Sequence, residues 1–332
     1  MLICQLLYLL CWQGDDHPGL LGQSLRADFK IFSTDSPWNT PIPENPELDS
    51  FSQEMINRLE GEGKNLRADY RQWTIPLYVI DATKAPTRDF FREKGYYPSV
   101  ADPKDKRYAR KIPFPKGIHP DPKRDGHLLL VDPKLRKTWD FSRLKYSSEE
   151  GWTASRIDVW DLDGTGTRTP FSGKRWWTGG ARGSGMPLIA GLIRPEEIKA
   201  GVINHALAFA CPNIRVSPYD PDRPQLCKPA HRSDGRQIGF TYLPMGARMQ
   251  LDPNLDLDKL GLSRTSKIIA KAMQTYGMYL CDGANGFKIY FQNMGPDDPK
   301  KTWSSFGKFN DLHKIPIQSF RILKCEYVIG QR

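Results

Sequence analysis

The stretch "GVINHALAFAC", residues 201–211, is apolar almost throughout and holds one histidine, His205, near its centre. An apolar run of this length directly after a glycine predicts a buried β-strand. Successive side chains of a strand point to opposite faces, so one face would be bulky and the other small. The bulky face would carry Ile203, His205, Leu207 and Phe209, and the small face Val202, Asn204, Ala206 and Ala208.

Outward from this strand, short apolar runs alternate with turns rather than with long helices. Strands are expected within 73–81, 128–131, 138–141, 152–160, 244–253, 278–283, 287–292 and 320–329. Helical spacing of apolar residues, with capping residues at the ends, occurs only near 50–61, 194–201 and 263–277. The chain is therefore predicted to be mainly β, an antiparallel β-sandwich or jelly-roll-like fold with two or three peripheral helices.

Length and composition set the organisation of the chain. The 332 residues are 39% hydrophobic and include 27 Pro and 28 Gly, which favours a globular core with many turns. No shift of composition marks a boundary, so residues 25–332 are expected to form a single β-rich domain. Residues 1–24 are expected to be a signal segment and leader that lack the usual basic start; a buried N-terminal strand or helix is the alternative.

The apolar opening "MLICQLLYLLC" is too short to cross a bilayer, which takes roughly 20 apolar residues. The protein is therefore expected to be secreted or periplasmic, with no stable membrane span. Cys4 and Cys11 fall within this opening. The remaining four cysteines are an even number, which suits disulfides after export. The predicted pairs are Cys211–Cys227 and Cys281–Cys325.

The charge pattern bears on the partners. The chain carries a formal net charge of +10, with basic stretches at 104–117 and 172–185. A positive surface attracts polyanions, but acidic residues are interspersed and no nucleic-acid-binding motif is present. The expected partner is a polysaccharide or oligosaccharide, neutral or anionic, and not a nucleic acid.

Six separated blocks follow one another in an order that resembles a family of secreted bacterial proteins. The blocks are SPWNTPI (36–42), DGHLLLVD (125–132), GSGMPLIAGLIRPEEIKAGVINHALAF (183–209), GARMQLDP (246–253), AMQTYGMYLCDGAN (272–285) and FNDLHKIP (309–316). The resemblance covers most of residues 32–328 and implies export and one domain. The family has no established activity, so the resemblance implies no catalytic residue. Its histidine-bearing Pro-Ala segment corresponds here to "KPAHRSDG" (228–235), which draws attention to His231.

His205 has two interpretations that stay open. A buried imidazole must find a hydrogen-bond partner, so His205 is either a satisfied core residue or an acid–base catalyst on the floor of a cleft. No partner lies within its own strand. The partner is expected to be one of Asp125, His127, Asp158 or His231.

These four residues are also candidate catalytic residues in their own right, together with Glu197. Asp125 and His127 begin a predicted hairpin, and His231 lies in a loop. The alternative for Asp125 and His127 is a turn that simply starts the strand, and an exposed loop histidine is usually only exposed. Two carboxylates flanking a bond, from Asp125, Asp158 and Glu197, are what glycoside hydrolysis needs.

Substrate-binding candidates come from aromatic and basic residues. Trp160, Trp176 and Trp177 offer faces that stack on sugar rings or fill a core. Arg182 could neutralise a uronate carboxylate. No cofactor is expected, although Asp161 and Asp163 before "GTG" have the look of either a short calcium loop or a plain turn.

Together these features predict a secreted carbohydrate-active enzyme, a glycoside hydrolase or a polysaccharide lyase. A lyase would use His205 as the base. The alternative is a non-catalytic secreted protein that binds glycans or belongs to the cell envelope, with structural histidines. Release of sugar that depends on the glycan supplied separates the two.

Overall fold

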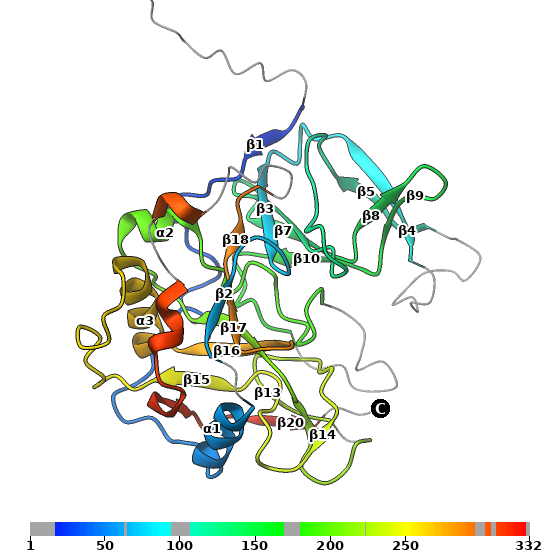
Figure 1. Ribbon diagram of the computed structural model, residues 1–332. Helices are drawn as coiled ribbons and strands as arrows, with labels where there is room; N and C mark the ends of the chain where they lie inside the picture. Colours follow the sequence, from blue (N-terminus) through cyan, green and yellow to red (C-terminus); the bar gives the residue numbers. More distant parts are fainter. Residues whose placement is uncertain are drawn as a thin grey trace, which may run out of the picture.

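A computed structural model describes residues 17–62, 65–93, 107–168, 180–222, 224–295, 303–306 and 310–329 (Figure 1). In these ranges β-strands predominate, and the three α-helices lie at the left and at the bottom of the view. The expectation of a mainly β protein with few helices is confirmed. The sheets are mixed rather than purely antiparallel, since each of the two largest contains parallel pairs as well as antiparallel ones.

The first large sheet is built around the predicted hairpin. Its strands run in the order β1 (Leu20–Gly22), β3 (Ile75–Ile80), β6 (Leu128–Asp132), β7 (Lys137–Ser142) and β10 (Arg156–Asp161), and β18 (Gln292–Asn293) also pairs with β3. β6 and β7 are antiparallel neighbours, with Leu128 opposite Phe141. β3 and β6 are parallel, with Leu77 opposite Leu129.

This sheet is buried on both faces, as the continuous apolar runs of β3 and β6 require. Leu129 and Val131 of β6 point into the larger of two hydrophobic clusters. Leu128 and Leu130 point the other way, into a smaller cluster that also holds Phe114. Because alternate side chains of β6 point to opposite faces of the sheet, this one strand contributes to both clusters.

The second large sheet contains the quoted stretch. Its order is β19 (Phe320–Ile322), β15 (Arg248–Leu251), β16 (Met278–Gly283), β11 (Leu207–Cys211), β17 (Lys288–Tyr290) and β2 (Arg67–Asp69). β11 begins at Leu207, so the prediction that the strand includes His205 is wrong. The backbone N–H of Ala206 donates to the Trp38 carbonyl at 2.8 Å, and that of Leu207 to the Gly277 carbonyl at 3.0 Å. The preceding residues therefore pair with loops and not with a strand.

Three smaller sheets complete the β structure. A four-stranded sheet, seen at the upper right of Figure 1, has the order β5 (Arg107–Pro113), β4 (Thr87–Arg92), β9 (Gly151–Ala154) and β8 (Lys145–Ser147). The two-stranded sheets pair β12 (Arg215–Ser217) with β14 (Gln237–Ile238), and β13 (Gln225–Cys227) with β20 (Tyr327–Ile329). The four-stranded sheet encloses the smaller cluster through Phe90 of β4 and Ala154 of β9.

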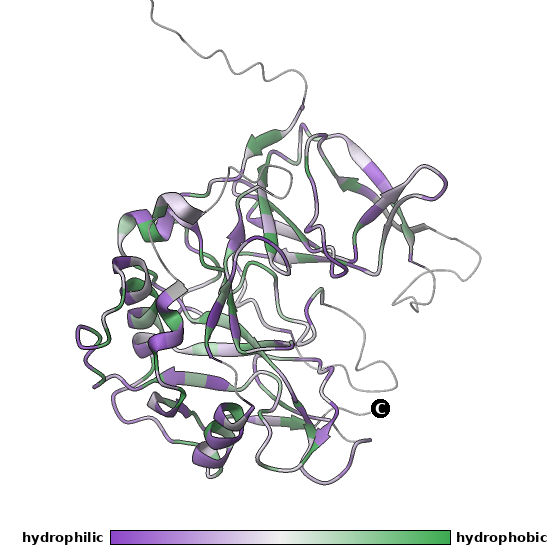
Figure 2. Cartoon of the chain, viewed as in Figure 1, coloured by the Kyte–Doolittle hydropathy of each residue, from purple (hydrophilic) through white to green (hydrophobic). Residues whose placement is uncertain are grey.

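The three helices lie where the sequence predicts them: α1 (Ser52–Gly61), α2 (Pro195–Ala200) and α3 (Arg264–Thr275). The Ser263 hydroxyl caps α3 by accepting from the Ser266 backbone N–H. Gly201 ends α2 at φ 82°, which suits glycine. Figure 2 shows hydrophobic and hydrophilic residues mixed along these helices, as expected for elements with one face on a core. Short 3₁₀ turns follow at Trp303–Phe306, Asn310–Lys314 and Ile317–Ser319.

The disulfide pairing differs from the prediction. Cys227 is bonded to Cys325, while Cys211 and Cys281 are buried free thiols. The reason is the topology: β13 and β20 are antiparallel partners and bring Cys227 beside Tyr327, close to Cys325. Cys211 and Cys281 instead lie in the central strands β11 and β16. Both predicted pairings are therefore wrong.

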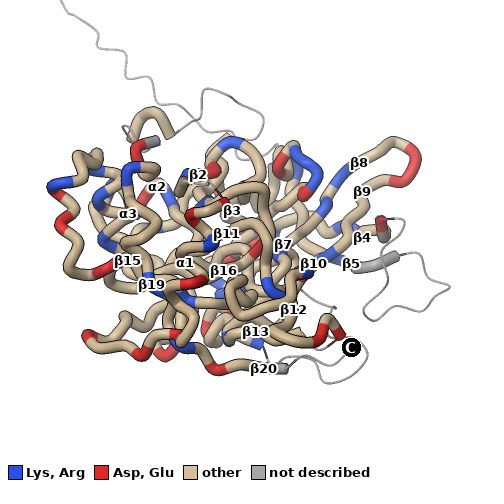
Figure 3. The backbone as a smooth tube through the Cα atoms, turned by 60° about the horizontal axis from the view of Figure 1, so that its bottom comes forward, with Lys and Arg blue, Asp and Glu red and all other residues tan. Residues whose placement is uncertain are grey.

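Two global properties complete the description. No helix in the described ranges has the length and apolarity that a bilayer crossing requires. Figure 3 shows Lys and Arg interspersed with Asp and Glu along the described backbone. The N-terminal segment 1–16 and residues 104–106 lie outside the described residues, and the side chains of 107–110 are not described.

Candidate functional site

Charged side chains converge on a cavity of about 220 Å³, which we call the polar cleft. They come from the turn before β6, the turn after β7, the start of β10, the loops 180–190 and 228–236, the end of β16, and β17. The titratable and charged residues that line it are Asp125, His127, Arg143, Arg156, Arg182, Arg232, Asp234, Asp282, Lys288 and Tyr290. Of the predicted site residues, the cleft therefore brings together Asp125, His127 and Arg182.

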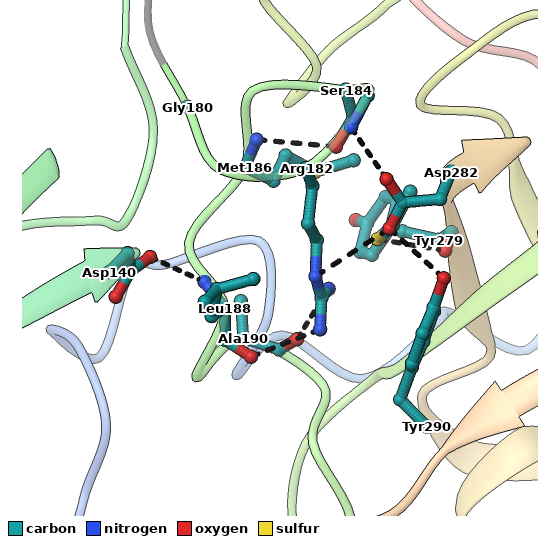
Figure 4. A network of polar contacts seen from close by, with 12 residues as sticks. Asp140, Gly180, Arg182, Ser184, Met186, Leu188, Ala190, Tyr279, Asp282 and Tyr290 are labelled. Carbon is teal, nitrogen blue, oxygen red and sulfur yellow. Dashed lines mark hydrogen bonds and ion pairs between the residues drawn. The ribbon is translucent and has the colours of Figure 1, made fainter. Parts of the chain in front are cut away.

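Arg182 supports the loop that forms one wall of the polar cleft (Figure 4). Its two terminal nitrogens donate to the Ala190 and Leu188 carbonyls, each at 3.0 Å, and its Nε lies 3.9 Å from Asp282 Oδ2. The guanidinium is fully buried. Arg182 is therefore committed to holding the protein together and acts as a positioning residue, although the sequence predicts it to bind substrate.

Asp282 is fixed from two sides at the end of β16. Its Oδ1 accepts from the Gly183 backbone N–H at 2.5 Å, and its Oδ2 accepts from the Tyr290 hydroxyl at 3.1 Å. Burial raises the pKa of Asp282, and the charge of Arg182 opposes that rise. Burial, reinforced by Asp282, also raises the pKa of Tyr290 well above its ordinary value. Tyr290 therefore remains a protonated donor that orients the carboxylate.

Asp234 lies next to Asp282 at the mouth of the cleft. A Cβ placed on Gly183 would come within 2.6 Å of Asp234 Oδ2, so only glycine allows this approach. The pKa of Asp234 is raised, first by loss of hydration and then by the charge of Asp282. Asp234 is nevertheless an exposed residue. A carboxyl group with a raised pKa that solvent can reach is suited to donate a proton.

His127 lies on the inner side of the cleft and is 7% exposed. Burial lowers its pKa, the charge of Asp125 opposes that effect, and the charge of Arg182 adds to it. A hydrogen bond with the Ala181 backbone holds the ring. A histidine with a lowered pKa is neutral at neutral pH and can accept a proton.

Two of the cationic side chains of the cleft form ion pairs with carboxylates that do not line the cleft. Arg143 Nη1 lies 3.4 Å from Glu93 Oε2, and Lys288 Nζ lies 2.5 Å from Asp69 Oδ2. Among the residues that the structure describes, Arg156 and Arg232 form no ion pair with a carboxylate. The unpaired charges of the cleft are therefore these two guanidiniums, together with the carboxyl groups of Asp125 and Asp234.

His205 lies in a different cavity, of about 490 Å³, which it lines with Arg194 and Glu197. Its Nε2 contacts Glu197 Oε1 at 2.9 Å and its Nδ1 contacts the Ala206 carbonyl at 2.8 Å. Arg194 Nη2 also contacts Glu197 Oε1, at 2.5 Å. The expected cavity beside His205 is present, but the predicted choice of partner is wrong, because the carboxylate comes from α2.

Glu197 belongs to this buried cluster and not to the polar cleft. Burial acts to raise its pKa, but His205 and Arg194 outweigh burial and lower the pKa overall. The Glu197 side chain is 3% exposed, and its Oε2 accepts from the backbone N–H of Arg194 at the start of α2. The cluster therefore locks the beginning of α2 against the segment that leads into β11.

Asp158, Trp160 and His231 lie together, away from the lining of the cleft. Asp158 accepts from Arg168 Nη1 at 2.7 Å and from the Gly180 N–H at 2.8 Å. The Arg168 guanidinium covers the Trp160 ring at 3.7 Å, and Trp160 is only 4% exposed. The His231 ring lies 6.2 Å from that of Trp160, and burial lowers the pKa of His231 to about 4. This arrangement packs the protein and leaves little surface for a sugar.

The remaining predicted residues fall in two places. Trp176 and Trp177 lie outside the described residues. Asp161 Oδ1 accepts from the backbone N–H of Asp163 at 2.9 Å, and Asp163 pairs with Arg136 at 2.9 Å. This is the geometry of a turn. Within the described ranges, no group of three acidic, histidine or cysteine side chains is arranged to hold a metal ion.

Sequence reasoning missed most of the polar cleft. Arg156, Arg232, Asp234, Asp282 and Tyr290 come from elements that are distant in the chain and meet only in the fold. A weak signal was present in "YLCDG", where an acidic residue and a glycine end an apolar strand, and in the polar loop "HRSDG". Ends of strands are common places for functional side chains.

Comparisons with known proteins add no assignment. No protein-family profile, curated protein or solved structure is significantly similar to this chain.

Proposed function

We propose that the protein is a secreted carbohydrate-active enzyme that cleaves a polysaccharide or oligosaccharide in the polar cleft. The observation that carries the proposal is the convergence of Asp234, with a raised pKa, His127, with a lowered pKa, and Asp125 on one cavity. Titratable groups whose pKa values are pushed apart are typical of acid–base catalysis. The Cys227–Cys325 disulfide supports an oxidising compartment outside the cytoplasm.

Hydrolysis is the reaction that the carboxyl groups favour. Asp234 would protonate the glycosidic oxygen as the bond to the anomeric carbon breaks. Asp125 would either activate a water molecule that attacks the anomeric carbon, or attack that carbon itself to form a glycosyl–enzyme ester, which water then hydrolyses with Asp234 as the base. Asp282 would act through its charge, which helps to raise the pKa of Asp234, and Tyr290 would hold Asp282 in place by its hydrogen bond.

Elimination is a second candidate, and the state of His127 favours it. A neutral imidazole can remove the proton beside a uronate carboxylate, after which the glycosidic oxygen leaves and a carbon–carbon double bond forms. In this proposal His127 takes the base role in place of His205, because His205 lines a different cavity.

An aromatic side chain at the rim of the cleft supports a sugar ligand. Trp73 lines the cleft and is 38% exposed, whereas Trp38, Trp139, Trp160 and Trp303 are buried. An accessible indole face stacks on the apolar face of a sugar ring. Trp73 could therefore align a glycan chain across Asp125, His127 and Asp234.

The test is incubation of the purified protein with neutral and acidic polysaccharides, followed by measurement of reducing ends and of the absorbance of unsaturated uronates. Hydrolysis predicts reducing ends alone, lost in Asp125→Asn and Asp234→Asn. Elimination predicts unsaturated products, lost in His127→Gln. The control is Asp258→Asn, a matched change at an exposed residue that pairs only with Lys267.

Activity that survives in all three cleft variants would overturn the assignment to the polar cleft. Glycan binding by the wild-type protein without any product would favour the alternative, a non-catalytic glycan-binding protein.

A further inference from the structure

We infer that Arg156 and Arg232 form an anion site within the polar cleft that binds the carboxylate of an acidic sugar. The inference rests on the proposed function and names its substrate class: a glycan that contains uronic acid. It is carried by the contacts these two guanidiniums make, and by those they lack.

Both side chains enter the cleft with hydrogen-bonding capacity to spare. The Nε atoms of Arg156 and Arg232 are buried, and neither has an acceptor in the described part of the chain. Arg156 donates once, from Nη1 to the Ser155 carbonyl at 2.9 Å. Arg232 reaches the carbonyls of Gly180 and Arg182 only at 3.5 Å. A buried donor without a partner is costly, so an acceptor from a ligand would complete the site.

The other cations of the cleft show what a satisfied group looks like here. Arg143 and Lys288 pair with carboxylates that lie outside the cleft. Arg182 also has a buried Nε without an acceptor, but that nitrogen lies 3.9 Å from Asp282 Oδ2 and the terminal nitrogens donate to two carbonyls. The charge or the hydrogen-bonding capacity of these three cations is used within the protein. The two guanidiniums of the anion site differ from them in having no ion-pair partner among the described residues.

The two unpaired guanidiniums also repel one another. The pKa of Arg232 is lowered, first by burial and next by the positive charge of Arg156, despite opposing contributions from three carboxylates. Two like charges held together in a partly desolvated site favour an anion between them. A guanidinium fork matches the two oxygens of a carboxylate and can bind it with two parallel hydrogen bonds.

A singly charged carboxylate suits this cleft better than a more highly charged group. Asp125 lines the same cavity, and its negative charge opposes any further negative charge. A uronate places one carboxylate on the ring, where Arg156 and Arg232 can hold it while Asp234 faces a glycosidic oxygen. The Arg pair thus takes the role that the sequence assigns to Arg182.

The experiment compares three oligosaccharides of one length by calorimetry: a polyuronate, the same chain with its carboxylates methyl-esterified, and a sulfated neutral chain. Binding is measured with the wild-type protein and with Asp234→Asn. We expect the polyuronate to bind at least about tenfold more tightly than the ester, and Arg156→Gln and Arg232→Gln each to weaken its binding by about tenfold or more.

Two further variants keep the test independent of folding. Arg232→Lys retains the charge but not the fork and should lose part of the affinity; melting temperatures check that every variant is folded. Lys137→Gln removes one positive charge from an exposed position on β7 and should bind like the wild type.

The inference is overturned if the ester or the sulfated chain binds as tightly as the polyuronate. It is equally overturned if folded Arg156→Gln and Arg232→Gln bind the polyuronate normally. Carboxylate-dependent binding without cleavage would support the anion site and contradict the enzymatic proposal. Cleavage of neutral glycans alone would support the enzymatic proposal and contradict the anion site.

Discussion

Asp140 is a residue at which pH is expected to act strongly on stability. It lies on β7, has no exposed surface, and faces Asp158 across the pair of β7 with β10. Its Oδ2 accepts from the Leu188 backbone N–H at 2.6 Å. Burial, with the charge of Asp158 adding to it, raises the pKa of Asp140 to about 7. Asp140→Asn keeps the shape and an acceptor for Leu188 but removes the titration.

The sign and size follow from linkage. Between the ordinary pKa of 3.8 and the folded value of about 7, the folded state binds more protons than the unfolded state. Stability therefore falls as pH rises through that window and is level above it. A shift of about 3 units corresponds to ~4 kcal/mol at 1.36 kcal/mol per unit. Relative to the wild type, Asp140→Asn should gain up to about that free energy between about pH 4 and about pH 8.

The measurement is urea unfolding of both proteins at several pH values across this window, read as the difference in unfolding free energy. Taking a difference removes the contributions of all other titrating groups. Asp81→Asn is a control that titrates outside this window: the hydroxyl of Thr83 donates to Asp81 and lowers its pKa below 3.8, so the difference between this variant and the wild type should stay level from about pH 5 to about pH 8. A difference between Asp140→Asn and the wild type that does not change with pH would refute the reasoning.

Three further outcomes are expected. Cys325→Ser opens the link to Cys227, 98 residues away, and should lower the unfolding free energy by roughly 4–5 kcal/mol in urea titrations; no loss would contradict a formed disulfide. Glu197→Gln leaves a buried imidazole without its carboxylate and should lower the unfolding free energy by about 3–5 kcal/mol. The folded variant should keep its glycan-cleaving activity, which kinetics below the melting temperature would show. Gly183→Ala should displace Asp234 and reduce kcat with little loss of melting temperature; full kcat would argue against Asp234 as the acid.

The elements that the sequence predicts well are those whose signals are local. The hairpin of β6 and β7 has two apolar runs joined by a turn at 132–137, and it forms as expected. α3 has both a capping Ser263 and an apolar stripe, and these alone locate it. A strand pairing within a few residues or a helix cap needs no knowledge of the rest of the chain.

The site and the disulfide could not be predicted in this way, because they depend on which distant segments meet. Cys227 lies sixteen residues after Cys211 in the chain, yet its partner is set by the pairing of β13 with β20. His205 is a comparable case. Its apolar neighbours indicate burial correctly, but the carboxylate that satisfies it comes from α2, eight residues earlier, after the chain has turned at Gly201.

The loop 180–190 explains why the polar cleft forms where the two large sheets meet. At one end, Gly183 donates to Asp282 of the second sheet; further along, Leu188 donates to Asp140 of the first. Arg182 spans the loop by bonding the carbonyls of Leu188 and Ala190. Because one short loop is anchored to both sheets, it fixes the distance between Asp282, the acidic residue of β16, and Arg156, the basic residue that begins β10. The rigid loop thereby supports the unpaired guanidiniums of Arg156 and Arg232. Without such support these side chains would move apart or turn toward solvent.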